Sequence, residues 1–280
     1  LRAVLAGHGS GDGPVGIAAG VAEPLRLELD RVAGELAQAR KLGLRIHAHA
    51  GSDPSQNGVV SDLAQKGLLG PDVTLVHCLH LDEADFDSIA SSGASVSLAP
   101  SSEMARGSGS PLVQRLLDRD IRPGLGIDDE RVAPGDMFGP MRETIALQHA
   151  TYFDRKLAGK GGLPNLLTTR EVIRYATSDG ARVAGLEQVT GSLEPGKKAD
   201  IILLRTDRPN IYPINDPIGA VVWGMDTSNI DWVLVEGRTL VSNGALSADV
   251  GRARDLALAA QRKVGLASGL LVEAATGGSG

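Results

Sequence analysis

The stretch LRIHAHA at residues 44–50 is followed by VTLVH at residues 73–77 and by IRPGLGID at residues 121–128. Each stretch is a short apolar run of β-strand character, and the three end at or near His49, His77 and Asp128. Histidine, histidine and aspartate in this order at strand ends are typical of a metal site at the carboxyl end of a (β/α) barrel. The arrangement predicts a metal-dependent hydrolase.

Helical segments separate these strands. Apolar residues recur at helical spacing over residues 24–42, and Gly43 ends that helix. The predicted order continues with a helix at 54–69, a strand at 73–78, a helix at 82–92, a strand at 94–99, a helix at 110–120 and a strand at 121–127. Further strands are expected at the very start of the chain and in a segment that ends at Glu103. This alternation predicts a parallel sheet with right-handed crossovers.

The pattern changes after Asp128. Residues 134–157 and 168–186 are expected to form two long helices, and Thr168 with Glu171 forms a capping box. Short strands are expected at 199–204, 220–223, 232–235 and 239–241, the last two as a hairpin, before a final helix at 252–266. We therefore divide this α/β chain into a barrel portion at 1–190, β-sandwich-type strands at 191–245, and a C-terminal helix with a flexible tail at 246–280.

The composition excludes several classes of partner. With 280 residues the chain can bury a full core, and with a net charge of −6 it lacks the clustered positive charge that nucleic acids or anionic membranes require. No run of about eighteen apolar residues is present to cross a membrane. The single cysteine, Cys78, cannot form an internal disulfide, which is typical of a reducing compartment. We therefore expect a cytoplasmic protein.

Four motifs together carry a family resemblance. They are His47-Ala48-His49, Val76-His77-Cys78, Gly126-Ile127-Asp128 and the segment GSLEPGKKAD at residues 191–200. With these motifs, the chain from about residue 43 to 244 resembles the amidohydrolase superfamily, specifically its cytosine/adenosine deaminase and triazine hydrolase branch. The resemblance implies a TIM-like (β/α) barrel, partial or complete within this chain, with a small β-sandwich element near the C-terminus.

The resemblance also implies a role for each strand-end residue. His49 matches the fifth-strand metal ligand, and His77 matches the sixth-strand histidine that binds the metal or steers its water. Asp128 matches the eighth-strand aspartate, which touches the metal and shuttles a proton. The implied cofactor is a divalent metal, zinc or alternatively iron. Such a cation lowers the pKa of its water from about 15.7 towards about 7, and a carboxylate accepts the proton as hydroxide attacks carbon.

Two positions depart from the family pattern. The first-strand His-x-His pair of the family has no counterpart, because His8 stands alone in a glycine-rich segment at the start of the chain, and we expect coding sequence upstream. Ser52 occupies the slot, three residues after the fifth-strand ligand, in which deaminases of this branch carry glutamate. The neighbouring Asp53 and the more distant Glu103 are both candidates to replace that carboxylate.

Other candidate residues have a structural explanation beside the functional one. Glu103 serves either in catalysis or substrate binding, or as a solvated loop acid. Alternation along the strand turns His47 to the opposite side from the fifth-strand ligand, so packing under the helices is favoured over ligation. Cys78 is expected to be a buried, inert thiol. His80 and His149 are expected to be structural or simply exposed.

The sequence therefore predicts an enzyme, an amidohydrolase-type hydrolase that cleaves a C–N or other C–X bond of a small cyclic or heteroaromatic compound. His49, His77 and Asp128 are the predicted metal ligands. Asp128, His77 and Glu103 are the predicted catalytic residues, with Asp128 as proton shuttle. The alternative is a non-catalytic or truncated barrel that lacks a complete metal site and serves in assembly. About five strands are identifiable where closure normally needs about eight, so we expect a homo-oligomer in which a second copy covers the open edge.

Overall fold

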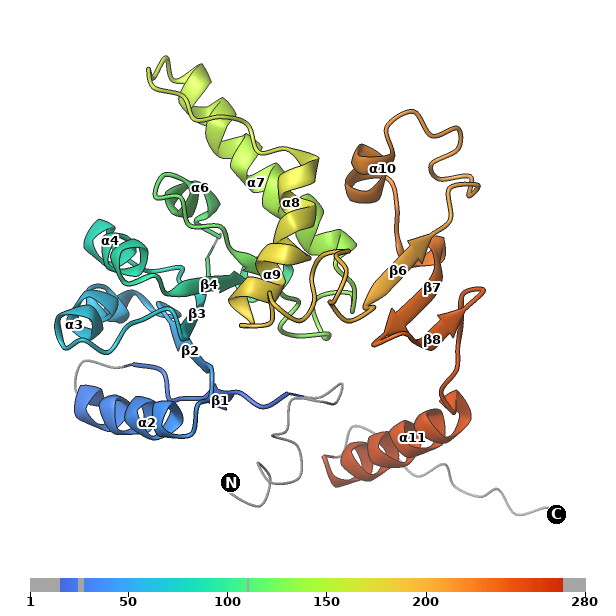
Figure 1. Cartoon of the computed structure of the whole chain (residues 1–280), viewed down its shortest axis with the longest axis horizontal. Helices are drawn as coiled ribbons and strands as arrows, with labels where there is room; N and C mark the ends of the chain where they lie inside the picture. Colours follow the sequence, from blue (N-terminus) through green and yellow to red (C-terminus); the bar gives the residue numbers. More distant parts are fainter. Residues whose placement is uncertain (1–15, 25–27, 110, 269–280) are drawn as a thin grey trace.

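The computed structural model describes residues 16–24, 28–109 and 111–268. Its larger sheet has five parallel strands that lie in chain order (Figure 1). The strands are β1 Ala19–Gly20, β2 Ile46–Ala50, β3 Val73–His77, β4 Ser95–Leu98 and β5 Gly124–Leu125. Parallel strands in sequential order with helices between them form a partial (β/α) barrel, as predicted, and within the described residues β1 and β5 are its two edges.

Helices connect the strands and cover the sheet. Those that follow β1 to β4 are α2 Leu29–Lys41, η2 Pro54–Gln56, α3 Val59–Gln65, α4 Glu83–Ser92, α5 Pro100–Ala105 and α6 Val113–Leu117. Those that follow β5 are α7 Phe138–Leu157, α8 Thr169–Tyr175 and α9 Ser178–Val183. In Figure 1, α2, α3, α4 and α6 follow one another along one side of the strands, and α9 packs beside β4 and β5.

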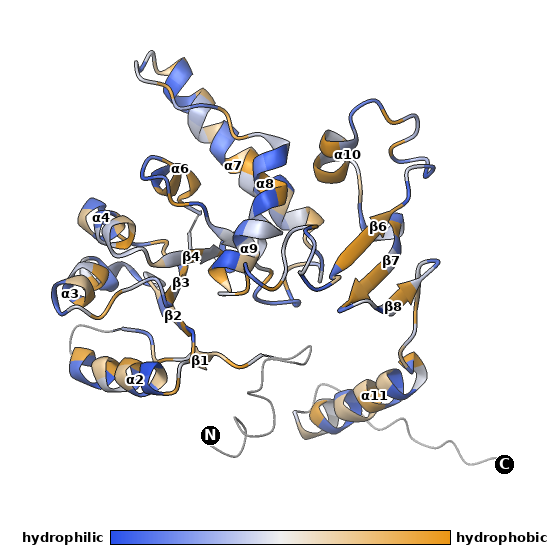
Figure 2. Ribbon diagram, viewed as in Figure 1, coloured by the Kyte–Doolittle hydropathy of each residue, from blue (hydrophilic) through white to orange (hydrophobic). Residues whose placement is uncertain are grey.

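The core is built from aliphatic side chains. Ile46, Leu75 and Val96 are fully buried on β2, β3 and β4. Figure 2 shows that the covering helices have an apolar side and a polar side, and on α2 the buried side includes Val32 and Leu36. Each fully buried aliphatic side chain contributes about 1.5–3 kcal/mol relative to its exposed state. The scarcity of aromatic residues is therefore compatible with a well-filled barrel core.

Local capping signals decide where several helices begin and end. The Asp82 side chain accepts a hydrogen bond from the third backbone N–H of α4 at 2.8 Å and forms a capping box. α4 ends at Gly93, whose φ of 72° lies in the left-handed region. Thr168 and Glu171 form the predicted capping box of α8. The residue after α2 and its cap is Gly43, with a φ of 66°, as the sequence predicted.

A smaller antiparallel sheet follows the barrel helices. Its strands are β6 Ile201–Leu204, β7 Ile230–Val235, β8 Arg238–Ser242 and β9 Ala245–Leu246. The turns Glu236-Gly237 and Asn243-Gly244 have positive φ at both residues, as type I′ hairpin turns require, and the predicted hairpin is confirmed. β6 is apolar along its whole length (Figure 2), yet Ile202 and Leu203 remain 59% and 50% exposed.

Several predicted elements differ from the structure. The long helix expected at 168–186 is divided into α8 and α9. Residues 220–223 belong to a helix, α10 Pro217–Trp223, because Asp216 caps its first turn and a proline occupies the first helical position. β5 covers only Gly124 and Leu125, since Pro123 directly before it has no N–H to donate to a ladder. Residues 54–69 form η2 and α3 instead of one helix, because Gly58 between them adopts the left-handed region with a φ of 83°.

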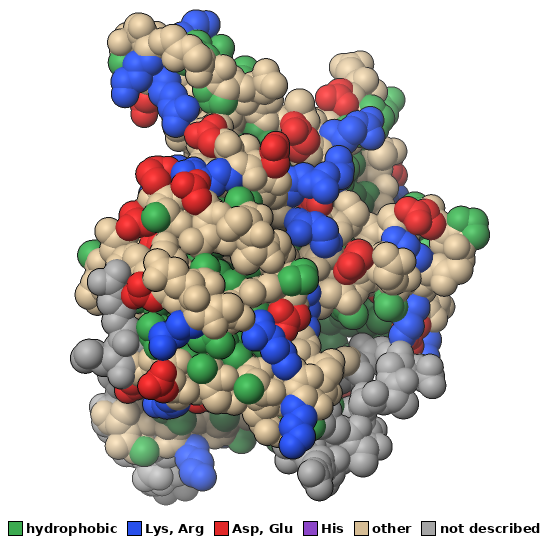
Figure 3. Space-filling model, turned by 60° about the vertical axis from the view of Figure 1, so that its left-hand side comes forward, with side chains coloured by type: hydrophobic (Ala, Val, Ile, Leu, Met, Phe, Trp, Pro, Cys, Tyr) green, Lys and Arg blue, Asp and Glu red, His purple; other side chains and the backbone are tan. Residues whose placement is uncertain are grey.

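The remaining elements are η3 Thr227–Asn229 and α11 Val250–Ala267. The glycine-rich start, the strand expected there and the flexible tail lie outside the described residues. None of the helices within the described ranges combines the length and the apolarity needed to cross a membrane. Figure 3 shows acidic and basic side chains interspersed over one face of the molecule.

Candidate active site

A pocket of about 320 Å³ lies at the carboxyl ends of the parallel strands. It is formed by the ends of β2 and β3, by α5, and by the segments that follow β1, β2, β3, α5 and β5. The lining residues are Glu23, His49, Ser52, His77, Leu79, Ser102, Glu103, Arg106, Ser108 and Asp128. Active sites of (β/α) barrels lie at this end of the strands, so the pocket is the candidate site by position.

His49 and His77 lie side by side in this pocket. β2 and β3 pair in parallel with Ala50 opposite His77, and the two imidazole rings stack with centroids 5.3 Å apart and planes 28° apart. Asp128, three residues after β5, lines the same pocket. The structure thus brings together the three residues predicted as metal ligands, and their role as ligands stays a prediction.

Glu103 holds the His77 ring. Its Oε1 atom lies 2.8 Å from His77 Nδ1 and also accepts the Ala99 N–H at 2.9 Å. Because a carboxylate accepts hydrogen bonds, this contact places the imidazole proton on Nδ1 and leaves Nε2 for another partner. The prediction that Glu103 ends a strand was wrong. Pro100 begins α5, and Glu103 lies in its first turn with only 2% of its surface exposed.

Asp128 has two polar neighbours in the pocket. Ser102 donates its hydroxyl to Asp128 Oδ2 at 2.6 Å, and the Arg106 guanidinium approaches the same atom at 4.0 Å. Arg106 is also paired with Asp129. Hydrogen bonds from Arg131, and then from Arg106, hold the pKa of the Asp129 carboxyl well below its usual range. Arg106 therefore balances two acidic groups on this side of the pocket.

Backbone strain coincides with the site. His77, Cys78 and Asp128 have positive φ angles of 75°, 57° and 60°. A non-glycine residue in the left-handed region costs of order 1–3 kcal/mol and persists only where its surroundings hold it. Two of these three residues are candidate ligands, so the fold maintains an unfavourable backbone where the site needs a particular side-chain direction.

Ser52 lines the pocket. Its N–H donates to Gln56 Oε1 at 3.0 Å. Asp53 is exposed and accepts the Ser55 N–H at 2.8 Å, so it caps η2 and is not among the pocket residues. Glu103 does line the pocket, with its Oε1 atom already bonded. Of the two candidates for the missing carboxylate, only Glu103 lies in the pocket.

The donor chemistry of the pocket suits a divalent cation. Two imidazoles and one carboxylate form a set that zinc and iron accept. Among the residues that the structure describes, no three His, Cys, Asp or Glu side chains stand close enough together to hold an ion. The chemical types of His49, His77 and Asp128 thus fit such an ion. Their spacing in this structure does not enclose one, although all three line the same pocket.

Comparison with known proteins identifies the family. Residues 2–240 match the profile of the Amidohydrolase family. The chain belongs to the amidohydrolase family. It is 31% identical over 249 residues to the 5'-deoxyadenosine deaminase of Methanothermobacter thermautotrophicus, over 85% of this chain and 56% of that protein. It is 30% identical over 249 residues to a 5-methylthioadenosine/S-adenosylhomocysteine deaminase of Desulfitobacterium hafniense, over 85% of this chain and 55% of that protein.

Solved structures share the amidohydrolase fold. An adenosine deaminase from Xanthomonas campestris with bound zinc gives a TM-score of 0.75 at 21% identity, over 91% of this chain and 58% of that chain. Atrazine chlorohydrolase from Arthrobacter aurescens, complexed with zinc, gives 0.77 at 20% identity, over 92% and 58%. The chain spans about half the length of the curated relatives it matches. The predicted fold class is confirmed.

Sequence reasoning missed part of this amidohydrolase pocket. The missed lining residues are Glu23, Leu79, Ser102, Arg106 and Ser108. A signal for Glu23 was present, because the apolar residues 17–22 end at Glu23 directly before a proline, much as the apolar run of β4 ends at Pro100. Ser102 and Arg106 had no such signal, because only the turns of α5 bring them to Asp128.

The described residues outside the pocket lining include His47, His80, His149 and Cys78. Burial lowers the pKa of the His47 imidazole on β2. His80 Nε2 and His149 Nε2 each bond a backbone carbonyl oxygen, at 2.7 Å and 2.9 Å. Cys78 is 1% exposed, and burial raises the pKa of its thiol far above the usual range. These environments agree with the structural explanations that the sequence favoured.

Proposed function

We propose that this amidohydrolase chain carries the site of a metal-dependent hydrolase that breaks a C–N bond, or another C–X bond, in a small cyclic or heteroaromatic compound. The observation that carries the proposal is the convergence of His49, His77 and Asp128 on one pocket at the carboxyl ends of the strands. Relatives named 5'-deoxyadenosine deaminase and triazine hydrolase support this substrate class.

The proposed cofactor is a divalent cation, held by His49, His77 and Asp128. Zinc is favoured because the neighbouring structures of an adenosine deaminase and an atrazine chlorohydrolase contain it, and iron is the alternative. Such an ion, when bound, supplies a water that ionises near neutral pH.

The side chains divide the remaining work of hydrolysis. Asp128 accepts a proton from the attacking water and returns it to the departing nitrogen, so that oxygen ends on the ring carbon and hydrogen on the amine. The Ser102 hydroxyl, 2.6 Å from Asp128 Oδ2, orients that carboxylate. Glu103 keeps the His77 proton on Nδ1, which leaves the unprotonated Nε2 available to the pocket.

The test combines metal content with product release. The full chain, purified without chelator, should hold near-stoichiometric zinc or iron and release ammonia from 5'-deoxyadenosine or from an amino-substituted triazine. His77→Ala should lose the metal, whereas the matched variant His149→Ala, on α7 and outside the pocket, should keep it. A chain without metal and without ammonia release would overturn the proposal and support the alternative, a barrel that serves in assembly.

A further inference from the structure

One acidic side chain of the pocket has no part in the roles assigned above. Glu23 lines the pocket together with His49 and Asp128, from the segment between β1 and α2. Its Oε1 atom is buried and makes no hydrogen bond within the described part of the chain. A buried carboxylate oxygen without a donor is costly and therefore uncommon in folded proteins. A ligand that brings the missing donor into the pocket would account for it.

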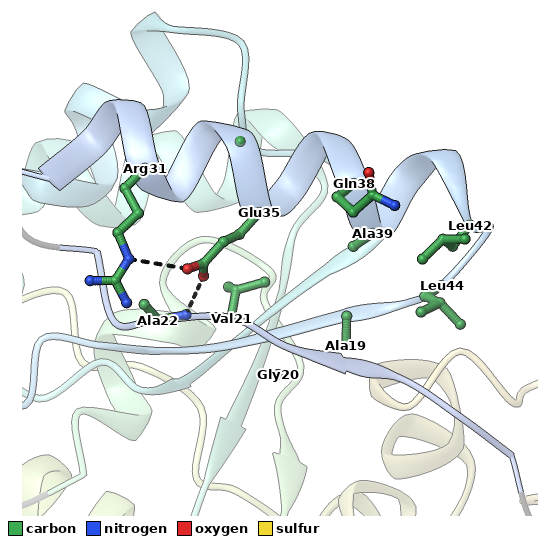
Figure 4. A pocket seen from close by; sticks show the side chains of 11 residues that line it. Ala19, Gly20, Val21, Ala22, Arg31, Glu35, Gln38, Ala39, Leu42 and Leu44 are labelled. Carbon is green, nitrogen blue, oxygen red and sulfur yellow. Dashed lines mark hydrogen bonds and ion pairs between the residues drawn. The ribbon is translucent and has the colours of Figure 1, made fainter. Parts of the chain in front are cut away.

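The backbone beside Glu23 is held at two points. The Val21 N–H donates to the His47 carbonyl at 3.0 Å, which continues the pairing of β1 with β2. The Ala22 N–H donates to Glu35 Oε2 at 2.8 Å, and Figure 4 shows Glu35 reaching from α2 to this segment. That bond lowers the pKa of Glu35, so the anchor stays charged at neutral pH. The two residues directly before Glu23 are therefore anchored to β2 and α2 through their backbone.

Strand register places Glu23 at the same level as His77. Ala19 pairs with Ile46, an offset of 27 residues (19 to 46). The same offset carried on to Glu23 reaches Ala50, and Ala50 pairs with His77. Glu23, in the segment after β1, and His77, at the end of β3, thus both lie at the carboxyl rim of the sheet.

Carboxylates outnumber arginine and lysine side chains among the described residues that line the pocket. Glu23, Glu103 and Asp128 give it three carboxylates, against one arginine, Arg106, among the described lining residues. Arg106 is already paired with Asp129, and Glu103 Oε2 is a second buried oxygen without a hydrogen bond in the described chain. An amino group or a ring N–H of a ligand would supply the donors that these two buried oxygens lack.

We propose that Glu23 is the substrate-binding carboxylate of this pocket, and that the substrate is a heteroaromatic ring with N–H donors. The inference rests on the proposed function and narrows its substrate class to amino-substituted rings. Glu23 Oε1 accepts the hydrogen bond of an exocyclic amino group, which fixes the ring in one orientation. Loss of a hydrogen bond to a charged acceptor weakens binding about 10- to 100-fold.

The test compares ring pairs that differ only in their amino groups. The zinc-loaded full chain is titrated by calorimetry with 9-methyladenine and 9-methylpurine, and with 2,4,6-triamino- and 2,4,6-trimethyl-1,3,5-triazine. Wild type should prefer the amino member of at least one pair by about tenfold or more. The isosteric Glu23→Gln should reduce this preference, because a neutral amide oxygen is a weaker acceptor than a carboxylate, and should leave the affinity for the other member unchanged. Glu28→Gln, an exposed glutamate next to α2, should behave like wild type.

Three further readouts complete the test. Glu23→Gln should keep the zinc affinity of wild type, because Glu23 is assigned to substrate, and a fall as large as that of His77→Ala would overturn the proposal in favour of a metal ligand. It should also unfold no more easily than wild type, since it removes a carboxylate whose Oε1 atom accepts no hydrogen bond from the described residues; if it fails to fold, Glu23→Asp replaces it. Equal binding of both members in both pairs would overturn the proposal. Zinc-loaded wild type that still releases ammonia would then leave the proposed hydrolase function intact.

Discussion

The two ends of the parallel sheet differ in how their polar groups are satisfied. At the amino end, the Arg45 guanidinium donates to the carbonyls of Pro71 and Val183 and to the hydroxyls of Thr74 and Ser95, at 2.7–3.2 Å. At the carboxyl end, two lining carboxylate oxygens are buried and accept no hydrogen bond from the described residues, and three residues of the rim have left-handed backbone.

Charge is compensated at the amino end even where hydrogen bonds are missing. Asp179 Oδ2 is buried without a hydrogen bond, yet Arg122, Arg174 and Arg182 lie 3.4, 3.9 and 3.6 Å from the same carboxylate. The carboxyl end has no such excess of cations among its described lining residues. The polar groups at the amino end of this barrel therefore hold its strands together. At the carboxyl end, polar groups are left available to bind a ligand.

The largest expected effect tests the carboxyl end. Asp128→Asn should lower turnover by about 10²–10⁴-fold, because the amide cannot accept and return a proton, while the unfolding free energy changes little. Ammonia release and urea denaturation are measured on the same preparation. Asp154→Asn, on the exposed face of α7, is the matched control and should be fully active. If Asp128→Asn kept more than a tenth of the activity, the proton-shuttle role would be lost.

At the amino end, a substitution should lower the unfolding free energy and leave the active site unchanged. Arg45→Met should lower the unfolding free energy by about 2–3 kcal/mol, since it removes several charge-assisted hydrogen bonds between strands. The folded fraction should keep wild-type metal content. The exposed Arg170→Met on α8 should change stability by less than about 0.5 kcal/mol. Equal stabilities for the two variants would contradict the division between the ends.

Glu103 should show a smaller effect that acts through His77. Glu103→Gln weakens the acceptor at His77 Nδ1 and should reduce zinc affinity by about 10- to 100-fold, measured by competition with a chelator. Glu143→Gln is the matched control, because Glu143 accepts a hydrogen bond from the hydroxyl of Ser101 on α5 and does not line the pocket. Unchanged zinc affinity in Glu103→Gln would show that the carboxylate supports only the fold.

The smallest expected effect concerns pH at the amino end. The hydrogen bond from Arg40 lowers the pKa of Asp72 below its usual 3.8. The pair therefore adds stability above about pH 4, and this is lost as pH falls through the lowered pKa. Because both side chains are about one-third exposed, the contribution is about 0.5 kcal/mol. Between about pH 6 and pH 3, the unfolding free energy of wild type should fall by up to about 0.5 kcal/mol more than that of Asp72→Asn. An equal fall in the two proteins would show that the pair does not contribute to stability.

The sequence was sufficient to predict helices and strands that have a clear hydrophobic period or a clear terminating residue. β2 and β3 are apolar runs bounded by glycine or proline, and they lie where predicted. Residues 220–223 were misassigned because four apolar residues cannot distinguish a helix from a strand. Pro100 is equally ambiguous, since proline both ends strands and begins helices, and this error moved Glu103 from α5 to a strand end.

The candidate site was predictable only where a ligand type ends a strand. His49, His77 and Asp128 were named on that ground and share one pocket. The pairing of Glu103 with His77 was not predictable, because it joins residues 26 positions apart through the turn of α5. The lack of a hydrogen-bond donor to Glu23 Oε1 among the described residues was even less predictable from the sequence. Whether a carboxylate lacks a donor depends on every neighbour in the fold, which no local pattern records.

The turns Glu236-Gly237 and Asn243-Gly244 also have a consequence for the time course of folding. Each joins strands that are adjacent in the chain, so β7, β8 and β9 can pair by closing very short loops, and isolated hairpins form in about 1–10 μs. Each step between β1, β2 and β3 instead closes a span of 27 residues before any pairing stabilises it. The small sheet is therefore expected to acquire its first protected amides while the barrel strands are still exchanging with solvent.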